Sequence, residues 1–236
     1  MQDMNTHAMM GYDRTSTMFA PDGRLLQVEY AKEGVRQSPT AIGMVCKDGV
    51  LLVADKRIMN KLIVSQSVEK IYKIDEHMGA TAVGNVMDGR VLIEKAQVKA
   101  QQHRITYGVP MDLVCLVKEI ANLKQFYTQY GGVRPFGVSI LYIGIDNDEP
   151  KLIASEPAGT YFGFKATAVG ESENEIKSIL LKEFKETMSI DEGIKLSMKI
   201  LKKVLGKDFD SSRVDGAYIK KDTKKFVKVD KKQFKV

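Results

Sequence analysis

Hydrophobic positions recur along this chain with two different periods, each found in its own set of segments. Short runs in which every second residue is apolar, or in which all are, are typical of strands, whereas a recurrence every three or four residues is typical of amphipathic helices. The first pattern predicts strands over residues 40–46, 50–57, 68–74, 79–83, 136–145, 151–154, 160–168, 215–220 and 224–229. The second predicts helices over about 24–35, 87–105, 111–127, 173–187 and 191–205.

The order of these elements predicts the architecture. Strands come first, then two helices, strands again, two more helices and a last pair of strands, with no linker rich in Pro, Gly or Ser between the halves. Such segregation favours an α+β arrangement, two sheets packed face to face with helices outside, over a doubly wound parallel sheet. At 236 residues we expect one domain over 12–236, preceded by a flexible, polar segment over 1–11.

Local signals mark where two helices begin. Residues 21–23 read Pro-Asp-Gly, a turn signal directly before the helix predicted at 24–35. Ser189 and Glu192 have the spacing of a capping box at the start of the last helix. The helix at 24–35 is short and amphipathic, so it must pack on another element.

The net charge of +6 raises the question of a nucleic-acid partner. Much of the excess lies over residues 220–235, where lysines alternate with apolar residues, which is typical of a strand pair with one solvated face. No helix-turn-helix, RNA-recognition or zinc-finger pattern accompanies the charge. A basic RNA-binding protein is therefore the least favoured hypothesis, and we expect no nucleic-acid partner.

The chain contains no run of about 18 uncharged apolar residues, the length that a membrane-spanning helix needs. Residues 1–10 lack a charged stretch followed by an apolar block, so no export signal is predicted. We expect a cytoplasmic protein with no membrane partner.

Cysteines and histidines are few. Cys46 and Cys115 each lie in an apolar periodic segment, and we expect both to be buried free thiols in a reducing compartment. His7, His77 and His103 do not pair with another His, Cys or carboxylate at metal-ligand spacing. We therefore expect neither a metal site nor a cofactor.

Three motifs carry a resemblance to a known family. Residues 12–14 read Tyr-Asp-Arg, residues 21–31 read Pro-Asp-Gly-Arg-Leu-Leu-Gln-Val-Glu-Tyr-Ala, and residues 127–137 read Tyr-Thr-Gln-Tyr-Gly-Gly-Val-Arg-Pro-Phe-Gly. They resemble the α subunits of the 20S proteasome, most of all the archaeal kind, and the resemblance covers nearly the whole chain.

The resemblance implies a four-layer αββα sandwich of the N-terminal-nucleophile hydrolase type. It implies a homo-heptameric outer ring at each end of a barrel whose β subunits cut the substrate. Such a ring gates the passage of unfolded polypeptides and docks a proteasome-activating ATPase.

The resemblance also locates the position of the catalytic threonine. In catalytic subunits this N-terminal residue stands four positions before the first-strand glycine, here Gly43, and this chain has Pro39 there. Proline has no hydroxyl and its nitrogen is tied into a ring, so neither the nucleophile nor its amine base can form. Asp55 and Lys70 match the family's acidic and lysine partners.

We therefore expect a subunit that is not itself an enzyme, within a complex that is a threonine-type endopeptidase. The alternative is an active hydrolase of the same fold, which would require the chain to be processed to a new N-terminus at Pro39 or Thr40.

By resemblance, the N-terminal segments of the ring meet over the axial pore. Tyr12, Asp13, Pro21 and Tyr30 match the residues that cluster to hold this gate open. The chemistry fits, because proline fixes a reverse turn, aspartate accepts hydrogen bonds and tyrosine hydroxyls donate them. An ordinary turn with surface tyrosines is the alternative.

A second motif of the family lines the narrow axial opening. Paired glycines allow backbones to approach an axis closely. A generic glycine-rich turn between a helix and a strand is the alternative. The matching residues, which we call the pore-loop motif, are Tyr130, Gly131, Gly132, Val133 and Arg134.

In α subunits the lysine that matches Lys70 lies in a pocket between neighbouring subunits and pairs with the C-terminal carboxylate of an activator. A partly desolvated lysine holds such an anion with more than the roughly 1 kcal/mol expected in open water. The family usually has glycine followed by Ser or Thr beside this pocket, whereas this chain has Ser38 and Pro39, which would narrow it. An exposed lysine on an amphipathic strand is the alternative.

By resemblance, the helix at 24–35 carries ring assembly. Its contact residues would be Leu25, Val28, Glu29 and Lys32. Lys32 and Gly34 stand where the family more often has arginine and alanine, and Gly34 costs about 1 kcal/mol of helix propensity relative to alanine. These two departures predict a weaker ring.

Overall fold

The computed structural model describes residues 2–58, 60 and 62–234, and within them the strands form two five-stranded antiparallel sheets. The first sheet has the order β10-β9-β2-β1-β8 and the second the order β3-β4-β5-β6-β7. The first is built from β1 (Ala41–Cys46), β2 (Gly49–Asp55), β8 (Ala166–Val169), β9 (Val214–Lys220) and β10 (Phe226–Lys228). The second is built from β3 (Ile71–Asp75), β4 (Met78–Gly84), β5 (Val138–Asp146), β6 (Glu149–Ser155) and β7 (Tyr161–Gly163).

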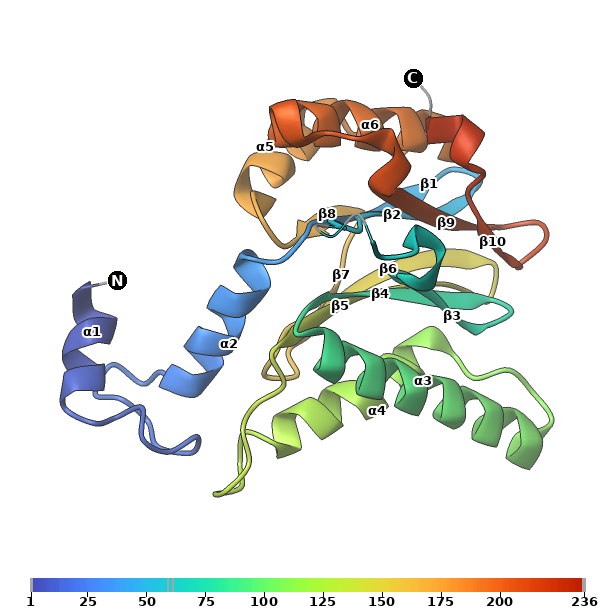
Figure 1. Cartoon of the computed structure of the whole chain (residues 1–236). Helices are drawn as coiled ribbons and strands as arrows, with labels where there is room; N and C mark the ends of the chain where they lie inside the picture. Colours follow the sequence, from blue (N-terminus) through green and yellow to red (C-terminus); the bar gives the residue numbers. More distant parts are fainter. Residues whose placement is uncertain (1, 59, 61, 235–236) are drawn as a thin grey trace.

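Two pairs of helices cover the outer faces of these sheets, and this confirms the predicted four-layer αββα sandwich (Figure 1). Helices α5 (Glu173–Glu183) and α6 (Ile190–Leu205) pack on the first sheet. Helices α3 (Val86–Tyr107) and α4 (Leu113–Phe126) pack on the second. Short 3-10 turns occupy Ser65–Ser67, Gly206–Asp208, Ser211–Arg213 and Lys231–Phe234.

The central strands β2 and β5 are buried along their whole length, because one face meets a helix pair and the other meets the opposite sheet. Successive side chains of β2 alternate between these environments: Leu51 joins the apolar core beneath α6, and Leu52 joins the core between the sheets. The sheets approach closely at Gly43, where an added Cβ would lie 2.5 Å from Leu152 Cδ1. Any larger residue there would force the Leu152 side chain to move.

The predicted capping box at the start of α6 is confirmed. The Ser189 hydroxyl accepts from the backbone N–H of Glu192 at 3.3 Å, and the Glu192 carboxylate accepts from the Ser189 N–H at 2.7 Å. Helix α3 has a cap that the sequence analysis missed, because the Asn85 side chain accepts from the N–H groups of Met87 and Asp88.

The N-terminal part of the chain projects from one end of the sandwich as an arm (Figure 1). It consists of α1 (Gln2–Met9), a turn and most of α2 (Leu26–Arg36). The C-terminal end of α2 anchors the arm in the domain, where it packs on β4 and β5 and Val35 enters the core between the sheets. The structure gives residues 2–9 a helical form, and the predicted flexibility of this segment stays a prediction.

Several predicted boundaries are corrected; the strand predicted at 68–74, for example, begins at Ile71. The helix predicted at 173–187 ends at Glu183, because Phe184 turns to an extended backbone conformation. The strand predicted at 160–168 is two short strands, β7 and β8, which belong to different sheets. The second strand ends at Asp55, two residues early, since Arg57 has a positive φ of 43° that breaks the extended run.

The prediction for the cysteines was right for one residue. Cys46 is buried beneath α6, and burial raises the pKa of its thiol to about 12. Cys115 is exposed, because the buried stripe of α4 runs through Leu113, Leu116 and Val117, which leaves position 115 on the outer face.

Over the described residues, no helix has both the length and the apolar character needed to cross a membrane.

Candidate functional site

The position predicted for a missing nucleophile lies directly before β1. Thr40, which follows Pro39, is buried, and its hydroxyl donates to the carbonyl oxygen of Glu171 at 2.5 Å. The Thr40 carbonyl accepts from the backbone N–H of Asp55 at 2.9 Å. Thr40 is thus held from two neighbouring segments, with its hydroxyl committed to the backbone.

A pocket of about 420 Å³ opens beside Thr40. Two arginines and two acidic residues line it, and Arg57 pairs with Glu171 across it. The remaining lining residues are Ser172, Val204, Leu205, Asp208 and Arg213. The cations of this pocket are therefore already paired with carboxylates of the same chain.

The acidic residue that matches the family's catalytic partner is Asp55, and its carboxylate is fully buried. Arg213 binds both carboxylate oxygens, Nε to Oδ1 and Nη2 to Oδ2, each at 2.5 Å. The backbone N–H of Arg57 donates to Oδ1 at 3.0 Å. This bidentate pair raises the pKa of the Arg213 guanidinium and neutralises the charge of Asp55.

Arg213 was missed in the sequence analysis, because no local pattern links it to Asp55. The two residues are 158 positions apart and meet because β9 pairs with β2, with Val214 opposite Asp55. Only the order of the strands brings them together.

We expect Arg213→Met to destabilise the folded chain by about 3–5 kcal/mol, because the change strands a buried carboxylate without its cation. The free energy of unfolding of the purified chain in urea measures this. The same change made in an Asp55→Asn background is the control, and it should cost much less. An equal loss in both backgrounds would mean that Arg213 acts through packing alone.

Lys70 directly precedes β3 and lies near Asp55 and Arg57. Burial lowers the pKa of its ammonium to about 8; the charge of Asp55 opposes this shift, and the charge of Arg57 adds to it. Among the described residues no carboxylate forms an ion pair with Lys70. The side chain is therefore a mostly buried amine whose nearest acid is already taken by Arg213.

Ser38, the second residue predicted for the activator pocket, follows Gln37, the C-cap of α2. Its hydroxyl donates to the carbonyl of Gly34 at 2.9 Å, and its own carbonyl accepts from the N–H of Glu171 at 2.8 Å. The Ser38 hydroxyl is thus committed to the last turn of α2. A joint role of Ser38 and Lys70 in binding an activator stays a prediction.

The four residues predicted for the gate lie around the turn that precedes α2. The Tyr30 hydroxyl donates to Asp13 Oδ2 at 3.2 Å, and the Gln27 amide donates to the Asp13 carbonyl at 2.7 Å. Burial, followed by the hydrogen bond to Asp13, raises the pKa of the Tyr30 hydroxyl. The structure thus joins Tyr30 to Asp13, while Pro21 is exposed at the turn.

The turn itself is closed by local contacts. The backbone N–H of Gly23 donates to Ala20 O and the N–H of Ala20 donates to Arg24 O, both at 2.8 Å. The Arg24 side chain holds the pKa of the Asp22 carboxyl below its usual range, and the His7 ring lies 3.5 Å from that carboxyl. The His7 ring also meets the Tyr12 ring edge to face, with centroids 6.1 Å apart. Tyr12 is therefore packed on α1.

The pore-loop motif lies between α4 and β5. Arg134 binds Asp88 with two hydrogen bonds, at 2.6 and 2.7 Å, and Asp88 also accepts from the N–H of Gly137 at 2.8 Å. Burial acts to raise the pKa of Asp88, but these hydrogen bonds outweigh it and leave that pKa lowered. Asp88, on the first turn of α3, was missed in the sequence analysis.

The tip of the same loop is open. Gly132 has a positive φ of 83°, and a Cβ added to it or to Gly131 would meet nothing within 4 Å. Tyr130 is half exposed, and its ring stacks on Phe126 with centroids 4.1 Å apart. The predicted loop is therefore tethered at Arg134 and free at its glycines.

The residues predicted for ring assembly are only in part available to a neighbour. Val28 is 5% exposed within the single chain, while Leu25 and Glu29 are half-buried. Lys32 pairs with Glu29 at 3.4 Å and with Glu156 at 3.5 Å. The assembly role of these residues stays a prediction, although Val28 already packs within its own chain.

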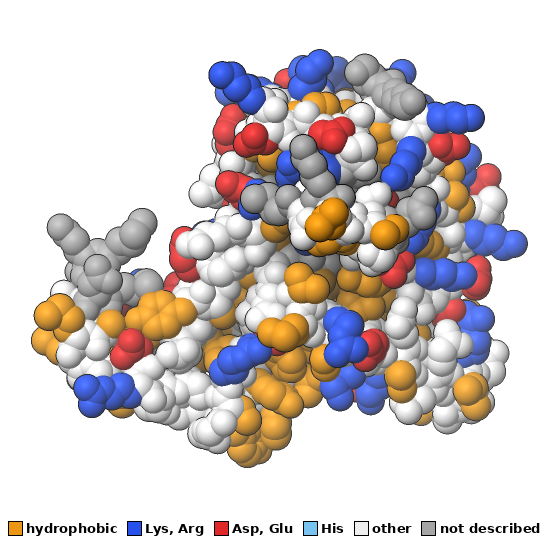
Figure 2. Space-filling view, viewed as in Figure 1, with side chains coloured by type: hydrophobic (Ala, Val, Ile, Leu, Met, Phe, Trp, Pro, Cys, Tyr) orange, Lys and Arg blue, Asp and Glu red, His pale blue; other side chains and the backbone are white. Residues whose placement is uncertain are grey.

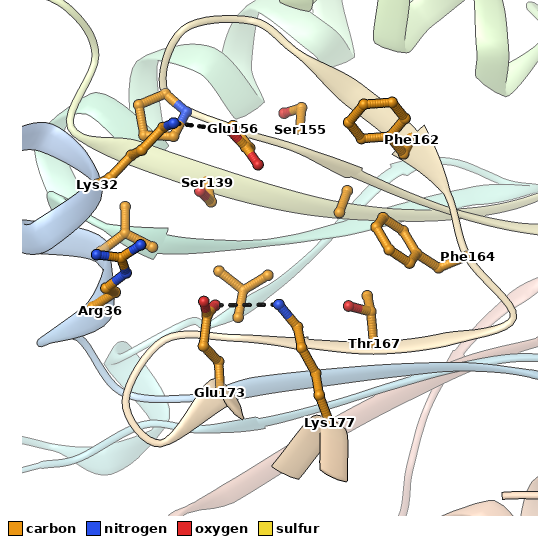
Figure 3. A pocket seen from close by; sticks show the side chains of 14 residues that line it. Lys32, Arg36, Ser139, Ser155, Glu156, Phe162, Phe164, Thr167, Glu173 and Lys177 are labelled. Atoms are coloured by element: carbon orange, nitrogen blue, oxygen red, sulfur yellow. Dashed lines mark ion pairs between the residues drawn. The ribbon is translucent and has the colours of Figure 1, made fainter. Parts of the chain in front are cut away.

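A cleft of about 110 Å³ lies between α2, the turn after β6 and the start of α5 (Figure 3). Lys32 points to Glu156 on one side of it, and Glu173 pairs with Lys177 on the other at 3.6 Å. Phe162 faces the cleft from the edge strand β7. Its ion pairs are satisfied within the chain.

Comparison with known families gives two matches. Residues 35–219 match the family model of proteasome subunits, and residues 12–33 match the model of the N-terminal signature of A-type proteasome subunits. The first covers both sheets except β10 and the last residue of β9, and the second covers the residues predicted for the gate and most of α2.

Several curated archaeal proteins, each named as the alpha chain of the proteasome, are similar to this chain over most of both lengths. That of Pyrococcus abyssi is 46% identical over 94% of this chain and 85% of its own. That of Thermococcus sibiricus is 45% identical over 93% of this chain and 84% of its own. That of Archaeoglobus fulgidus is 45% identical over 96% of this chain and 92% of its own.

Proposed function

Since this chain belongs to the proteasome subunit family, and within it to the α subunits, we propose that it is the non-catalytic gate of a cytoplasmic 20S core particle. Proteasome α subunits assemble with β subunits in the core particle. In this proposal seven copies form the outer ring, admit unfolded polypeptides to the chamber of the β subunits and dock an ATPase activator.

Pro39 is the observation that carries the non-catalytic assignment. It stands where the resemblance places the threonine nucleophile, and it offers neither a hydroxyl nor a free primary amine. Thr40, the next hydroxyl-bearing residue along the chain, is buried and donates to a backbone carbonyl. Asp55, which would balance the charge of a catalytic lysine, is bound by Arg213 instead.

The attachment of the N-terminal segment to α2 supports the gating role. Asp13 is held by Tyr30 through its side chain and by Gln27 through its backbone, so the chain before it is tied to the arm rather than to the sandwich. A partner that shifts the turn at 20–24 would carry this attachment with it. The gate is thus a small element whose two positions need differ by only a few kcal/mol.

Lys70 supports the docking role. It is a mostly buried cation without a carboxylate partner among the described residues, near an acid that is already neutralised. A C-terminal carboxylate brought by an activator would supply the missing anion. Ser38 lies just after the C-terminal end of α2. The bulk of its side chain would shape the pocket proposed at Lys70.

Exposed apolar side chains support the assembly of this chain with others. On the arm, Met9, Met10 and Phe19 are 89%, 68% and 66% exposed, and near the pore loop Val86 and Met87 are 75% and 68% exposed. Figure 2 shows hydrophobic side chains gathered between the arm and the side of the molecule that carries α3 and α4. Apolar side chains that gather at the surface in this way are typical of protein interfaces.

The test is the mass of the purified chain after co-assembly with β subunits. We expect an unprocessed chain of 26.4 kDa that forms no covalent adduct with a threonine-directed epoxyketone, while the β subunit of the same particle is labelled. A chain that begins at Pro39 or Thr40 and carries the adduct would refute the proposal. Electron microscopy of the same particle tests the seven-membered ring.

A further inference from the structure

Lys124, near the end of α4, is a lysine with no exposed surface. Its Nζ lies within hydrogen-bond distance of four oxygens and, among the described residues, of no carboxylate. The distances are 2.9 Å to Ser155 Oγ, 3.1 Å to Val138 O, 3.2 Å to Glu156 O and 3.4 Å to Ser155 O. Lysine is almost never buried completely unless it is paired, so these neutral acceptors must replace the water that the amino group loses.

The acceptors lie where the ladder between β5 and β6 ends. Ile140 pairs with Ser155, and the same register would place Pro157 opposite Val138. Proline has no backbone N–H, so it could not bind the Val138 carbonyl. Lys124 supplies the donor that the strand lacks at this point.

The bond from Lys124 to Val138 also closes the neck of the pore loop. We use this name for residues 127–137, which leave α4 after Phe126 and enter β5 at Val138. Lys124 lies just before this loop in sequence, and Val138 directly follows it. The bond between them therefore joins the two ends of the loop. The Arg134 to Asp88 pair ties the exit of the loop to α3, so only the tip around Gly131 is free.

Glu156 extends the junction to the arm. Its carbonyl accepts from Lys124, and its carboxylate pairs with Lys32 of α2 at 3.5 Å (Figure 3). One residue thus contacts both the support of the pore loop and the helix that carries the gate. A shift of α2 would reach the loop through two polar contacts.

We propose that Lys124 is the positioning residue of the pore loop, which it fixes to the Ser155–Glu156 turn and, through Glu156, couples to α2. This rests on the proposed function in that the loop lines the passage for unfolded chains. Lys124 itself touches no substrate. Its role is to keep the loop tip at a defined place, so that the opening stays narrow.

The experiment follows the loop tip in the assembled particle. A nitroxide is attached to Gly131→Cys in a Cys115→Ser background, because Cys115 is exposed whereas Cys46 is buried with a thiol pKa of about 12. We expect Lys124→Met to raise the mobility of the tip in the spectrum. Lys118→Met, which removes an exposed lysine of the same helix, should leave the mobility unchanged. Equal spectra for both variants would overturn the proposal.

The passage of substrate is measured in the same particles after removal of residues 1–12. The substrate is an unfolded polypeptide with a disulfide-closed loop, which needs a wider opening than a single strand. We expect Lys124→Met to raise the degradation of this polypeptide several-fold, relative to the degradation of the same polypeptide after its disulfide is reduced. A mobile tip with unchanged selectivity would support the positioning role and refute the proposed function of the loop, so the two failures are distinguishable.

Two further variants keep the test decisive if Lys124→Met does not assemble. Ser155→Ala removes the shortest of the four contacts and should raise tip mobility less, in the same direction. Glu156→Gln keeps the carbonyl but breaks the pair with Lys32, so the tip should stay ordered and no longer respond when an activator shifts α2. An unchanged response in Glu156→Gln would overturn the coupling, and an unchanged tip in Ser155→Ala would overturn the positioning.

Discussion

Lys70→Ala is expected to reduce the stimulation of the assembled particle by its ATPase activator to the basal level of peptide hydrolysis. The side chain is a mostly buried ammonium without a carboxylate partner among the described residues, and the activator's C-terminal carboxylate would provide one. In such a partly desolvated place the attraction exceeds the roughly 1 kcal/mol of open water. The ratio of stimulated to basal hydrolysis measures the effect, and a ratio retained by Lys70→Ala would show that another contact dominates.

The same site predicts how docking depends on pH. Burial lowers the pKa of Lys70 to about 8, so the free site loses its positive charge as the pH rises through that value. Binding of an anionic C-terminus should therefore weaken on the alkaline side and be strongest below it. Lys70→Arg is the matched control, because a guanidinium stays charged throughout this range. Anisotropy of a labelled activator peptide measures binding, and a wild-type affinity that is flat across this range would contradict the prediction.

Removal of residues 1–12 is expected to raise the hydrolysis of an unfolded protein by the particle without activator. The deletion removes α1 and Tyr12 but leaves Asp13 attached to Tyr30 and Gln27, so the rest of the arm should keep its fold. The initial rate of degradation of an unfolded protein measures the effect. The intact particle with saturating activator gives the upper limit.

Tyr30→Phe is the graded companion of this deletion. It keeps the ring and removes only the hydroxyl that donates to Asp13 at 3.2 Å, so it should shift the balance of the gate while the segment remains. We expect the activator to stimulate hydrolysis less in this variant. The proteolytic chamber of the β subunits should be unchanged. Unchanged hydrolysis after the deletion would show that residues 1–12 are not the barrier.

The candidate site was predictable to the extent that its parts are local. The turn at 21–23, the helix after it and the glycines of the pore loop are signalled by residue types within a few positions. The contact of Tyr30 with Asp13 was predicted through the family resemblance, and the structure joins the two residues. The predicted cluster did not include Gln27, whose amide holds the backbone of Asp13.

The polar contacts that hold these parts in place could not be predicted in this way. Arg213 reaches Asp55 across 158 residues, and Arg134 reaches Asp88 across 46. Arg213 and Asp88 do not stand out in sequence, because charged residues are common on every element. Lys124 has an apolar-periodic setting, but nothing in that setting says that its amine meets four oxygens.

By itself, the sequence determined most of the order of strands and helices, the family to which the chain belongs and the presence of proline at position 39. These follow from periodicity, from motifs and from residue identity, which act over a few neighbouring positions. Tertiary structure alone decided that Arg213 neutralises Asp55, that Cys115 faces outward and that Lys124 is buried at the neck of the pore loop. The reason is that the order of strands in a sheet, and the face that each helix turns toward it, set which distant side chains share a low-dielectric space.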